Sequence, residues 1–154
     1  MRLLWTIVAL GLLACGEERG GSEQPPFELP ERMGGQDAAA GAEIVEVRMT
    51  GDGTSSASFE PAQITISPGT AIRFVNVSGG PHNVAFWRDS VPPGATTLLN
   101  TAMPDRVGDL SSKFVTAPND SIRIEFPAQA PTGVYKGYCA PHLALGMTID
   151  ITVR

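Results

Sequence analysis

The chain has 154 residues, of which 42% are hydrophobic and 18% charged, and its formal net charge is −5. This length and composition predict one globular domain with a hydrophobic core, because two independent cores would need a longer chain. Residues 43–154 hold ten acidic and eight basic side chains. This balance excludes the strongly basic face that nucleic-acid binding requires.

The first fourteen residues, MRLLWTIVALGLLA, have the pattern of an export signal, with Arg2 followed by an apolar run that is short for a membrane span. The run ends in Leu-Leu-Ala-Cys, which resembles the lipobox of bacterial lipoproteins. In that family the cysteine becomes the lipidated first residue of the mature chain. We therefore expect residues 1–14 to be a lipoprotein signal peptide and Cys15 to be lipidated. The alternatives are a secretory signal cut near Ala14 and an uncleaved anchor.

Residues 16–42 are rich in Gly, Pro, Ala and charged residues, with six acidic side chains against two basic ones. Such a composition cannot bury enough apolar surface to fold. We expect residues 15–42 to be a lipidated cysteine with a disordered tether, and residues 43–154 to be the folded domain. The protein is then extracytoplasmic, in the periplasm or at the cell surface, and is anchored to a bacterial membrane.

From Glu43 onward, short runs of alternating apolar and polar residues predict β-strands. The alternation is clearest in MTIDITVR, residues 147–154, where every second side chain is apolar. Seven or eight such strands predict an all-β protein with an antiparallel sandwich or barrel. The segment at about 88–120 contains Pro92, Pro93, Pro104 and Pro118 and is irregular. We expect this segment to wrap one side of the sandwich, with a helical turn or an edge strand.

The stretch YCAPHLALGM, residues 138–147, contains one of the two cysteines and one of the two histidines of the chain, together with a methionine. Each has an ordinary role by itself, since a buried Cys is a small apolar residue and a Met fills gaps in a core. Pro141 and the flanking strand patterns favour a loop over a helix. Such a loop can turn Cys139, His142 and Met147 toward one point, which is the geometry of a metal site.

The ligand types narrow the choice of metal. Thiolate and thioether are soft ligands that suit copper, whereas structural zinc takes four Cys or His ligands and hard cations take oxygen. Two His, one Cys and a weak axial Met form the ligand set of electron-transfer blue copper. The loop supplies one histidine. The other histidine of the chain is His82, which follows the turn at 79–81 between two predicted strands.

Several motifs in order resemble the cupredoxins, and more narrowly the plastocyanin, pseudoazurin and amicyanin group. They are F-x-P at 59–61, I-x-I-x-x-G at 64–69, P-H-N-V at 81–84, G-x-Y at 133–135 and C-x-P-H-x-x-x-G-M at 139–147. The resemblance covers nearly all of residues 43–154 and implies a cupredoxin-like Greek-key β-sandwich. Gly137 departs from the pattern, because relatives commonly carry an aromatic residue two positions before the cysteine.

The resemblance assigns the ligands of one type 1 copper. It implies that Cys139, His82 and His142 form the strong trigonal set and that Met147 is the weak axial ligand. Asn83 then matches the family asparagine whose side chain ties the two ligand loops together. The implied function is transfer of single electrons by copper cycling between Cu(I) and Cu(II), and the protein is not an enzyme.

Apolar residues flank His142 on a loop that we expect to be exposed, and Pro141 also shapes that loop beside the ligands. This cluster predicts a small docking patch through which electrons pass by the His142 edge; its members are Pro141, Leu143, Ala144 and Leu145. We expect a monomer that makes transient encounters with redox proteins. Candidate partners are c-type cytochromes and membrane respiratory or photosynthetic complexes.

Other functions could use the same residues. An extracytoplasmic copper storage or delivery lipoprotein is the main alternative, although the sequence lacks the exposed Met-rich or His-rich tracts that carriers often use. A Cys-His nucleophile and base would leave Met147 and His82 without a role. A domain with a buried Cys and unrelated histidines is a further alternative. Copper enzymes such as nitrite reductases or multicopper oxidases need further metal sites, and two histidines in total exclude that architecture.

Overall fold

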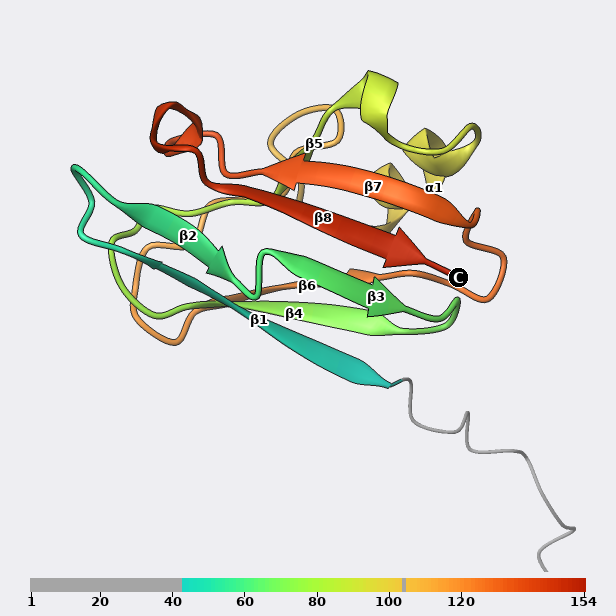
Figure 1. The fold of residues 1–154 in the computed structure, drawn as a ribbon, viewed down its shortest axis with the longest axis horizontal. Helices are drawn as coiled ribbons and strands as arrows, with labels where there is room; N and C mark the ends of the chain where they lie inside the picture. The colour runs from blue at the N-terminus through green and yellow to red at the C-terminus, as the bar shows by residue number, and fades with distance from the viewer. Residues whose placement is uncertain (1–42, 104) are drawn as a thin grey trace, which may run out of the picture. The chain divides into compact units, whose positions relative to one another are not determined.

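The structure is a computed structural model that describes residues 43–103 and 105–154 (Figure 1). The predicted signal peptide, the lipidation site Cys15 and the tether up to residue 42 lie outside the described residues. None of the helices in the described part of the chain has the length and apolarity needed to cross a membrane.

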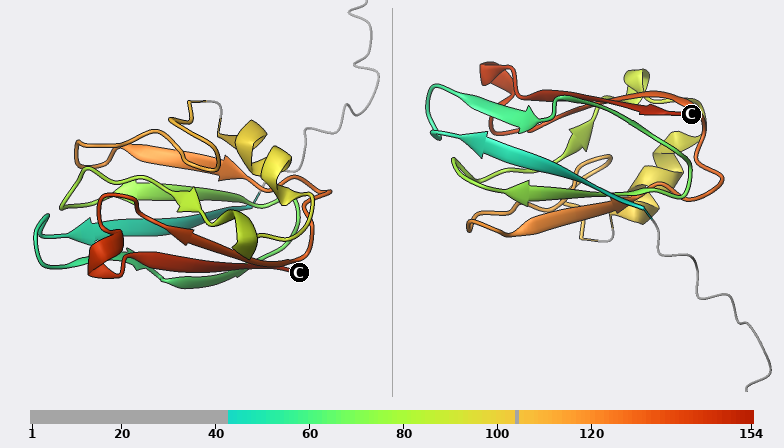
Figure 2. Two further views of the ribbon diagram at one scale, coloured as in Figure 1. Left: turned by 90° about the horizontal axis from the view of Figure 1, so that it is seen from above. Right: turned by 60° about the horizontal axis from the view of Figure 1, so that its bottom comes forward.

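Eight strands of the described domain form two four-stranded sheets that face each other as layers (Figure 2), so the predicted β-sandwich is confirmed. The first sheet has the order β2-β1-β4-β6 and consists of β1 (Ile44–Gly51), β2 (Ala57–Glu60), β4 (Ala71–Asn76) and β6 (Ser121–Glu125). The second sheet has the order β3-β8-β7-β5 and consists of β3 (Gln63–Ile66), β5 (Ala85–Phe86), β7 (Gly133–Tyr138) and β8 (Thr148–Val153).

Both sheets are mixed, which corrects the expectation of a purely antiparallel arrangement. β1 runs parallel to β4, and β3 runs parallel to β8, while the other neighbouring strands are antiparallel. The parallel pair of β1 with β4 arises because the chain leaves the first sheet after β2, forms β3 in the second sheet and returns for β4, and β3 pairs with the last strand, β8. Alternation of apolar and polar residues is the same in both kinds of pairing, so it could not reveal this difference.

The core lies between the sheets and consists of the apolar side chains of the alternating runs. Two edge-to-face aromatic pairs fill it: Phe59 meets Phe74 with ring centroids 5.9 Å apart, and Phe126 meets Tyr135 at 5.2 Å. The hydroxyl of Tyr135 donates to the carbonyl of Pro131 at 2.7 Å. The polar end of this buried ring is therefore satisfied, as a buried hydroxyl requires.

The irregular segment at 88–120 contains more helix than a single turn. A 3-10 turn, η1 (Arg88–Ser90), is followed by the helix α1 (Ala95–Ala102), which lies next to β6 (Figure 2). The helix buries Ala95 and Leu99 in the core. This buried face is what holds a short helix in place, since a helix of this length is unstable by itself.

The stretch at 110–115, which follows α1, runs alongside residues 82–86. It is a second neighbour of β5, in addition to β7. Isolated bridges join His82 to Val115 and Ala85 to Ser111. The amide of Phe86 also donates to the carbonyl of Leu110 at 2.9 Å. The segment therefore covers the edge of the second sheet next to the predicted His82 ligand.

The two predicted ligand loops lie at the same end of the sandwich. β1, β4 and β7 end there and β8 begins there, at the end opposite the C-terminus (Figure 1). The connection from β4 to β5 carries His82, and the connection from β7 to β8 carries Cys139 and His142. The sandwich thus brings residues from two distant parts of the sequence to one place.

Candidate metal centre

His82, Cys139 and His142 converge on one point. The Sγ atom of Cys139 lies 3.6 Å from His82 Nδ1 and 3.5 Å from His142 Nδ1, and the two Nδ1 atoms are 3.2 Å apart. All three residues are buried. Bonds of roughly 2.0 Å to nitrogen and 2.3 Å to sulfur around one ion would separate the ligand atoms by about 3–4 Å. The observed spacing therefore fits a single metal ion.

The imidazole of His82 is oriented from behind by the backbone. Its Nε2 atom lies 2.8 Å from the carbonyl oxygen of Ser78. A carbonyl can only accept, so Nε2 carries the proton and Nδ1 presents its lone pair to the site. Two backbone hydrogen bonds of 2.9 Å between His82 and Val115 fix the loop itself. A second ring nitrogen held in this way is typical of metal-ligating histidines.

The loop after β7 folds back around the other predicted ligands. The amide of Cys139 donates to the carbonyl of Met147 at 3.0 Å, and the amide of Met147 donates to the carbonyl of His142 at 3.3 Å. Between His142 and Met147 lies the 3-10 turn η2 (Leu143–Leu145), which ends at Gly146 with a φ of 79°. Met147 is therefore tied through its backbone to both residues, and its side chain is buried.

Burial shifts the pKa values of Cys139 and His142. Burial raises the pKa of the Cys139 thiol, while hydrogen bonds from the backbone amides of Asn83 and His142 act in the opposite direction. Burial lowers the pKa of His142, and the neighbouring His82 imidazole lowers it further. His142 is thus held in the neutral form that binds metals, and a cation beside Cys139 would favour the thiolate.

The side chain of Asn83 joins the two ligand loops. The amide of Ala140 donates to Asn83 Oδ1 at 2.8 Å, and Asn83 Nδ2 donates to the hydroxyl of Ser111 at 3.0 Å. Asn83 is fully buried, and partners at both ends of its amide fix its orientation. Ser112 holds the next residue, because the amide of Val84 donates to its hydroxyl at 2.9 Å.

Three serines contribute to the site without having been singled out by the sequence. Ser78 acts through its carbonyl, a group that every residue has, so its identity carries no signal. Ser111 and Ser112 lie in the irregular segment, where polar residues are common for many reasons. The pairing of two adjacent serines with the P-H-N-V motif is visible only in three dimensions.

The predicted docking patch lies on the outside of the site. Pro141, Leu143 and Ala144 are exposed, and Leu145 is half-buried. Leu143 is a large apolar residue, and its exposed fraction is 41%. His142 itself is 5% exposed, whereas His82 and Cys139 are at 0%. Of these three residues, His142 is therefore the one nearest to solvent.

The chemistry of this donor set fits copper. A thiolate and two imidazoles are soft to borderline ligands, and carboxylates, which suit hard cations, are absent from the described cluster. A β-sandwich with this buried site at one end has the architecture of the cupredoxins, the class of small copper proteins. The family described as copper binding proteins, plastocyanin/azurin family, matches residues 45–154. The chain belongs to this family, and its cofactor is copper.

Individual relatives agree with this assignment. The plastocyanin of Ulva pertusa is 34% identical over 110 residues, which cover 70% of this chain and 97% of the relative. The chloroplastic plastocyanin of Physcomitrium patens is 35% identical over 115 residues, which cover 74% of this chain. The aligned region spans 60–64% of the length of three chloroplastic plastocyanins, from Physcomitrium patens, Pisum sativum and Silene latifolia.

A solved plastocyanin structure has a similar fold. The structure of the oxidized form of plastocyanin from Dryopteris crassirhizoma superposes with a TM-score of 0.53 at 26% sequence identity. The match covers 71% of this chain and 100% of the plastocyanin. The sequence and the fold therefore point to the same family.

Proposed function

We propose that the protein carries single electrons on one type 1 copper held by His82, Cys139, His142 and Met147. The observation that carries the proposal is the convergence of one thiol and two Nδ1 atoms from three buried residues. The thiolate and the imidazoles would form the strong ligand set, with the Met147 thioether as the weak axial ligand. Copper, when bound, supplies a one-electron couple between Cu(I) and Cu(II).

The part of the protein in this function is to hold the ligands in fixed positions. The carbonyl of Ser78 sets the orientation of His82, and Asn83 sets the spacing of the two loops. Ligands whose positions are fixed by their neighbours have little freedom to rearrange when the charge at the site changes. Small rearrangement favours fast electron transfer, and it requires no proton or substrate at the site.

We propose that electrons enter and leave at the edge of His142. This ligand is the least buried of the three, and apolar residues surround it. The docking patch would form small, transient contacts with redox partners; its residues are Pro141, Leu143, Ala144 and Leu145. Candidate partners are c-type cytochromes and membrane respiratory or photosynthetic complexes, which the protein would meet as a monomer.

We propose that the protein works outside the cytoplasm, in the periplasm or at the cell surface. The lipobox-like end of the leader supports lipidation of Cys15, and the tether that follows would let the domain move over the membrane surface. Each methylene of an acyl chain contributes roughly 0.8 kcal/mol of membrane affinity, so more than one chain gives a stable anchor.

Voltammetry of the copper-loaded protein, combined with a copper-transfer assay, tests electron transfer against storage or delivery. An electron carrier gives a reversible one-electron wave and keeps its copper when a chelator is added. A storage or delivery protein gives up its copper to the chelator or to an apoprotein acceptor. Rapid copper loss without a reversible wave would contradict the proposal.

A further inference from the structure

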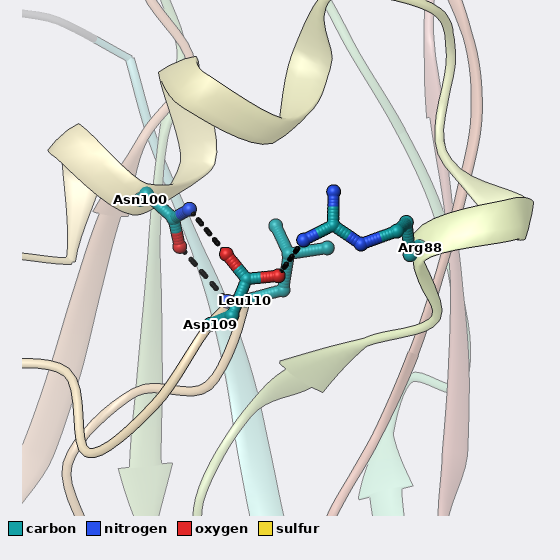
Figure 3. Close-up of polar contacts among 4 residues, drawn as sticks. All are labelled: Arg88, Asn100, Asp109 and Leu110. Atoms are coloured by element: carbon teal, nitrogen blue, oxygen red, sulfur yellow. Dashed lines mark hydrogen bonds and ion pairs between the residues drawn. The ribbon is translucent and has the colours of Figure 1, made fainter.

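A polar cluster of Arg88, Asn100, Asp109 and Leu110 joins separate parts of the irregular segment (Figure 3). Asn100, on α1, donates from Nδ2 to Asp109 Oδ1 at 2.8 Å, and its Oδ1 accepts from the amide of Leu110 at 2.8 Å. The guanidinium of Arg88, on η1, pairs with the other carboxylate oxygen of Asp109. We call Asn100 and Asp109 the clamp. Asn100 joins α1 to the stretch that begins at Leu110, and the pairing of Asp109 with Arg88 adds η1.

The clamp has one possible arrangement of donors and acceptors. A carboxylate can only accept, so the NH₂ group of Asn100 must face Asp109 and its oxygen must face the Leu110 amide. Leu110 is 1% exposed, so its amide has no ready replacement partner in water. The position of Leu110 therefore depends on the orientation of Asn100.

Residues 110–112 transmit this position to the ligand loop. The carbonyl of Leu110 accepts from the amide of Phe86, and the amide of Ser112 donates to the carbonyl of Val84, both at 2.9 Å. These two bonds lie on either side of Ser111. The hydroxyl of Ser111 is thereby held where it accepts from the side chain of Asn83.

Asn83 connects this stretch to the cysteine loop. Its Oδ1 atom accepts from the amide of Ala140, the residue directly after Cys139. An amide side chain turned by 180° would present NH₂ to that amide, and the bond would be lost. The Ala140 amide can only donate, so it selects this orientation, and the Ser111 hydroxyl accepts from Nδ2 and anchors the other end of the side chain.

We propose that the clamp is a positioning device for the metal centre, in which Asn100 and Asp109 hold Ser111 so that its hydroxyl anchors the side chain of Asn83 and thereby sets the spacing of the two ligand loops. Both residues act through Asn83 and are remote from the ligand atoms. The inference rests on the proposed copper site for its effect on copper. The chain of hydrogen bonds that carries it is present in the protein itself.

The test exchanges the two partners of the clamp. Asn100→Asp keeps an acceptor for Leu110 but sets two carboxylates against each other, and the double variant Asn100→Asp/Asp109→Asn restores a donor and an acceptor. Thr97→Asp adds the same charge at an exposed position of α1 and is the matched control. Ser111→Ala breaks the link to Asn83 without changing any charge.

Hydrogen exchange of the Ala140 amide in the apoprotein, followed by NMR, reports whether Asn83 still faces it. Ala140 is exposed, so this hydrogen bond is its main protection. We expect exchange to be about tenfold faster in Asn100→Asp and in Ser111→Ala. The double variant and Thr97→Asp should exchange at the wild-type rate.

The copper-loaded proteins give a second measurement. Competition with a Cu(I) chelator should show affinity about tenfold lower in Asn100→Asp and Ser111→Ala, as is typical when a group that orients a ligand is removed. The visible thiolate-to-copper band of these two variants should shift. The double variant should recover both the wild-type affinity and the wild-type band.

Wild-type exchange at Ala140 in folded Asn100→Asp and Ser111→Ala would overturn the proposal. Failure of the double variant to recover would also overturn it. If Asn100→Asp does not fold, Asp109→Ala, which removes the acceptor of Asn100 Nδ2 and leaves Ser111 in place, decides by the same two measurements. A wild type that forms no copper complex overturns the proposed function, whereas the Ala140 exchange rates still decide the positioning role.

Discussion

The two histidines of the site differ in how the protein surrounds them. His82 is fully buried, and its Nε2 atom is engaged by the Ser78 carbonyl. His142 is slightly exposed and lies on a loop whose neighbouring side chains face solvent. The first histidine therefore fixes the site to the sandwich, and the second is placed where a partner can approach.

Tyr135 offers a pH-dependent test of the core. Burial raises the pKa of its hydroxyl, which donates to Pro131 as the neutral group. The unfolded chain releases this proton near its ordinary pKa of ~10, before the folded chain does. The stabilisation from Tyr135 is therefore complete below about pH 10 and is lost as the pH rises through the folded-state pKa.

We expect apoprotein with Tyr135 to be about 1 kcal/mol more stable than Tyr135→Phe at neutral pH, because the variant loses one hydrogen bond. This difference in unfolding free energy should shrink above about pH 10. Denaturant unfolding of both proteins across this pH range measures it. A difference that stays constant up to the most alkaline pH would contradict the assignment.

The turn between β1 and β2 supports the His82 loop from one side. The Asp52 carboxylate accepts from the Ser55 hydroxyl and from the amides of Ser55, Thr54 and Ser56, and these bonds hold its pKa well below the usual range. The turn is therefore ordered by its own carboxylate. It places Gly51 against the connection that leads from β4 to His82.

Close contact between Gly51 and Gly79 predicts a specific sensitivity. Gly79 has a φ of 75°, and a Cβ there would lie 2.5 Å from the carbonyl carbon of Gly51. Gly69 also has a positive φ, 94°, but a Cβ there would have no atom within 4 Å. Alanine at Gly69 should thus suffer only from its backbone conformation, whereas alanine at Gly79 should also displace the turn.

We expect Gly69→Ala to lose about 1 kcal/mol of unfolding free energy and Gly79→Ala to lose about 3 kcal/mol. Only Gly79→Ala should weaken copper binding, because Gly79 belongs to the His82 loop. Chemical denaturation and chelator competition measure the two effects. Equal losses of unfolding free energy and of copper affinity in the two variants would show that the contact with Gly51 has no influence on the site.

The docking patch can be tested with one charge. Leu143, in η2, is 41% exposed, and Val134, on β7, is 44% exposed, which makes it a matched control away from the patch. We expect Leu143→Asp to slow electron exchange with a c-type cytochrome about tenfold while the visible band stays the same. Val134→Asp should leave the rate unchanged. Equal rates for the two variants would count against the patch.

The site depends on the packing of the whole sandwich. His82 follows β4 of the first sheet, and Cys139 follows β7 of the second. β5, which begins three residues after His82, pairs with β7, so the second sheet brings His82 and Cys139 together, while the Ser78 carbonyl in the connection from the first sheet orients the His82 ring. Copper binding should in turn stabilise the fold, because the unfolded chain has no preformed site.

Much of this arrangement could be predicted from the sequence. Strict alternation, as in MTIDITVR, indicates strands directly, because one face of each strand is buried. The meeting of His82, Cys139 and His142 could be predicted because these residue types are rare in the chain and stand in specific motifs. Asn83 stood out for the same reason, as the neighbour of a motif histidine.

Other features left no periodic signal. Asn100, Asp109 and Ser111 are ordinary polar residues in a segment of prolines and glycines, and their importance comes from contacts across that segment. The parallel pairing of β1 with β4 depends on the path between the sheets, which the alternation does not encode. The glycine at position 137, where relatives commonly carry an aromatic residue, has a steric reason. A Cβ there would lie 3.1 Å from the Ala85 carbonyl oxygen.

The proposed anchor can be tested in cells. We expect the wild-type protein to sediment with membranes and Cys15→Ser to be released into the soluble fraction, because the acyl chains supply the attachment. Cys139→Ser is the control, since it removes the other cysteine and should stay in the membrane fraction. An identical distribution of all three proteins would contradict lipidation at Cys15.

Titration of the purified apoprotein with Cu(II) tests the central claim most directly. We predict an intense visible thiolate-to-copper band and narrow copper hyperfine splitting in the wild type, since Cys139 is the proposed thiolate ligand. Cys139→Ser, with its fold verified by far-UV circular dichroism, should lack both signals. A colourless wild type, or a Cys139→Ser variant that keeps the band, would contradict the assignment of this site as a blue copper centre.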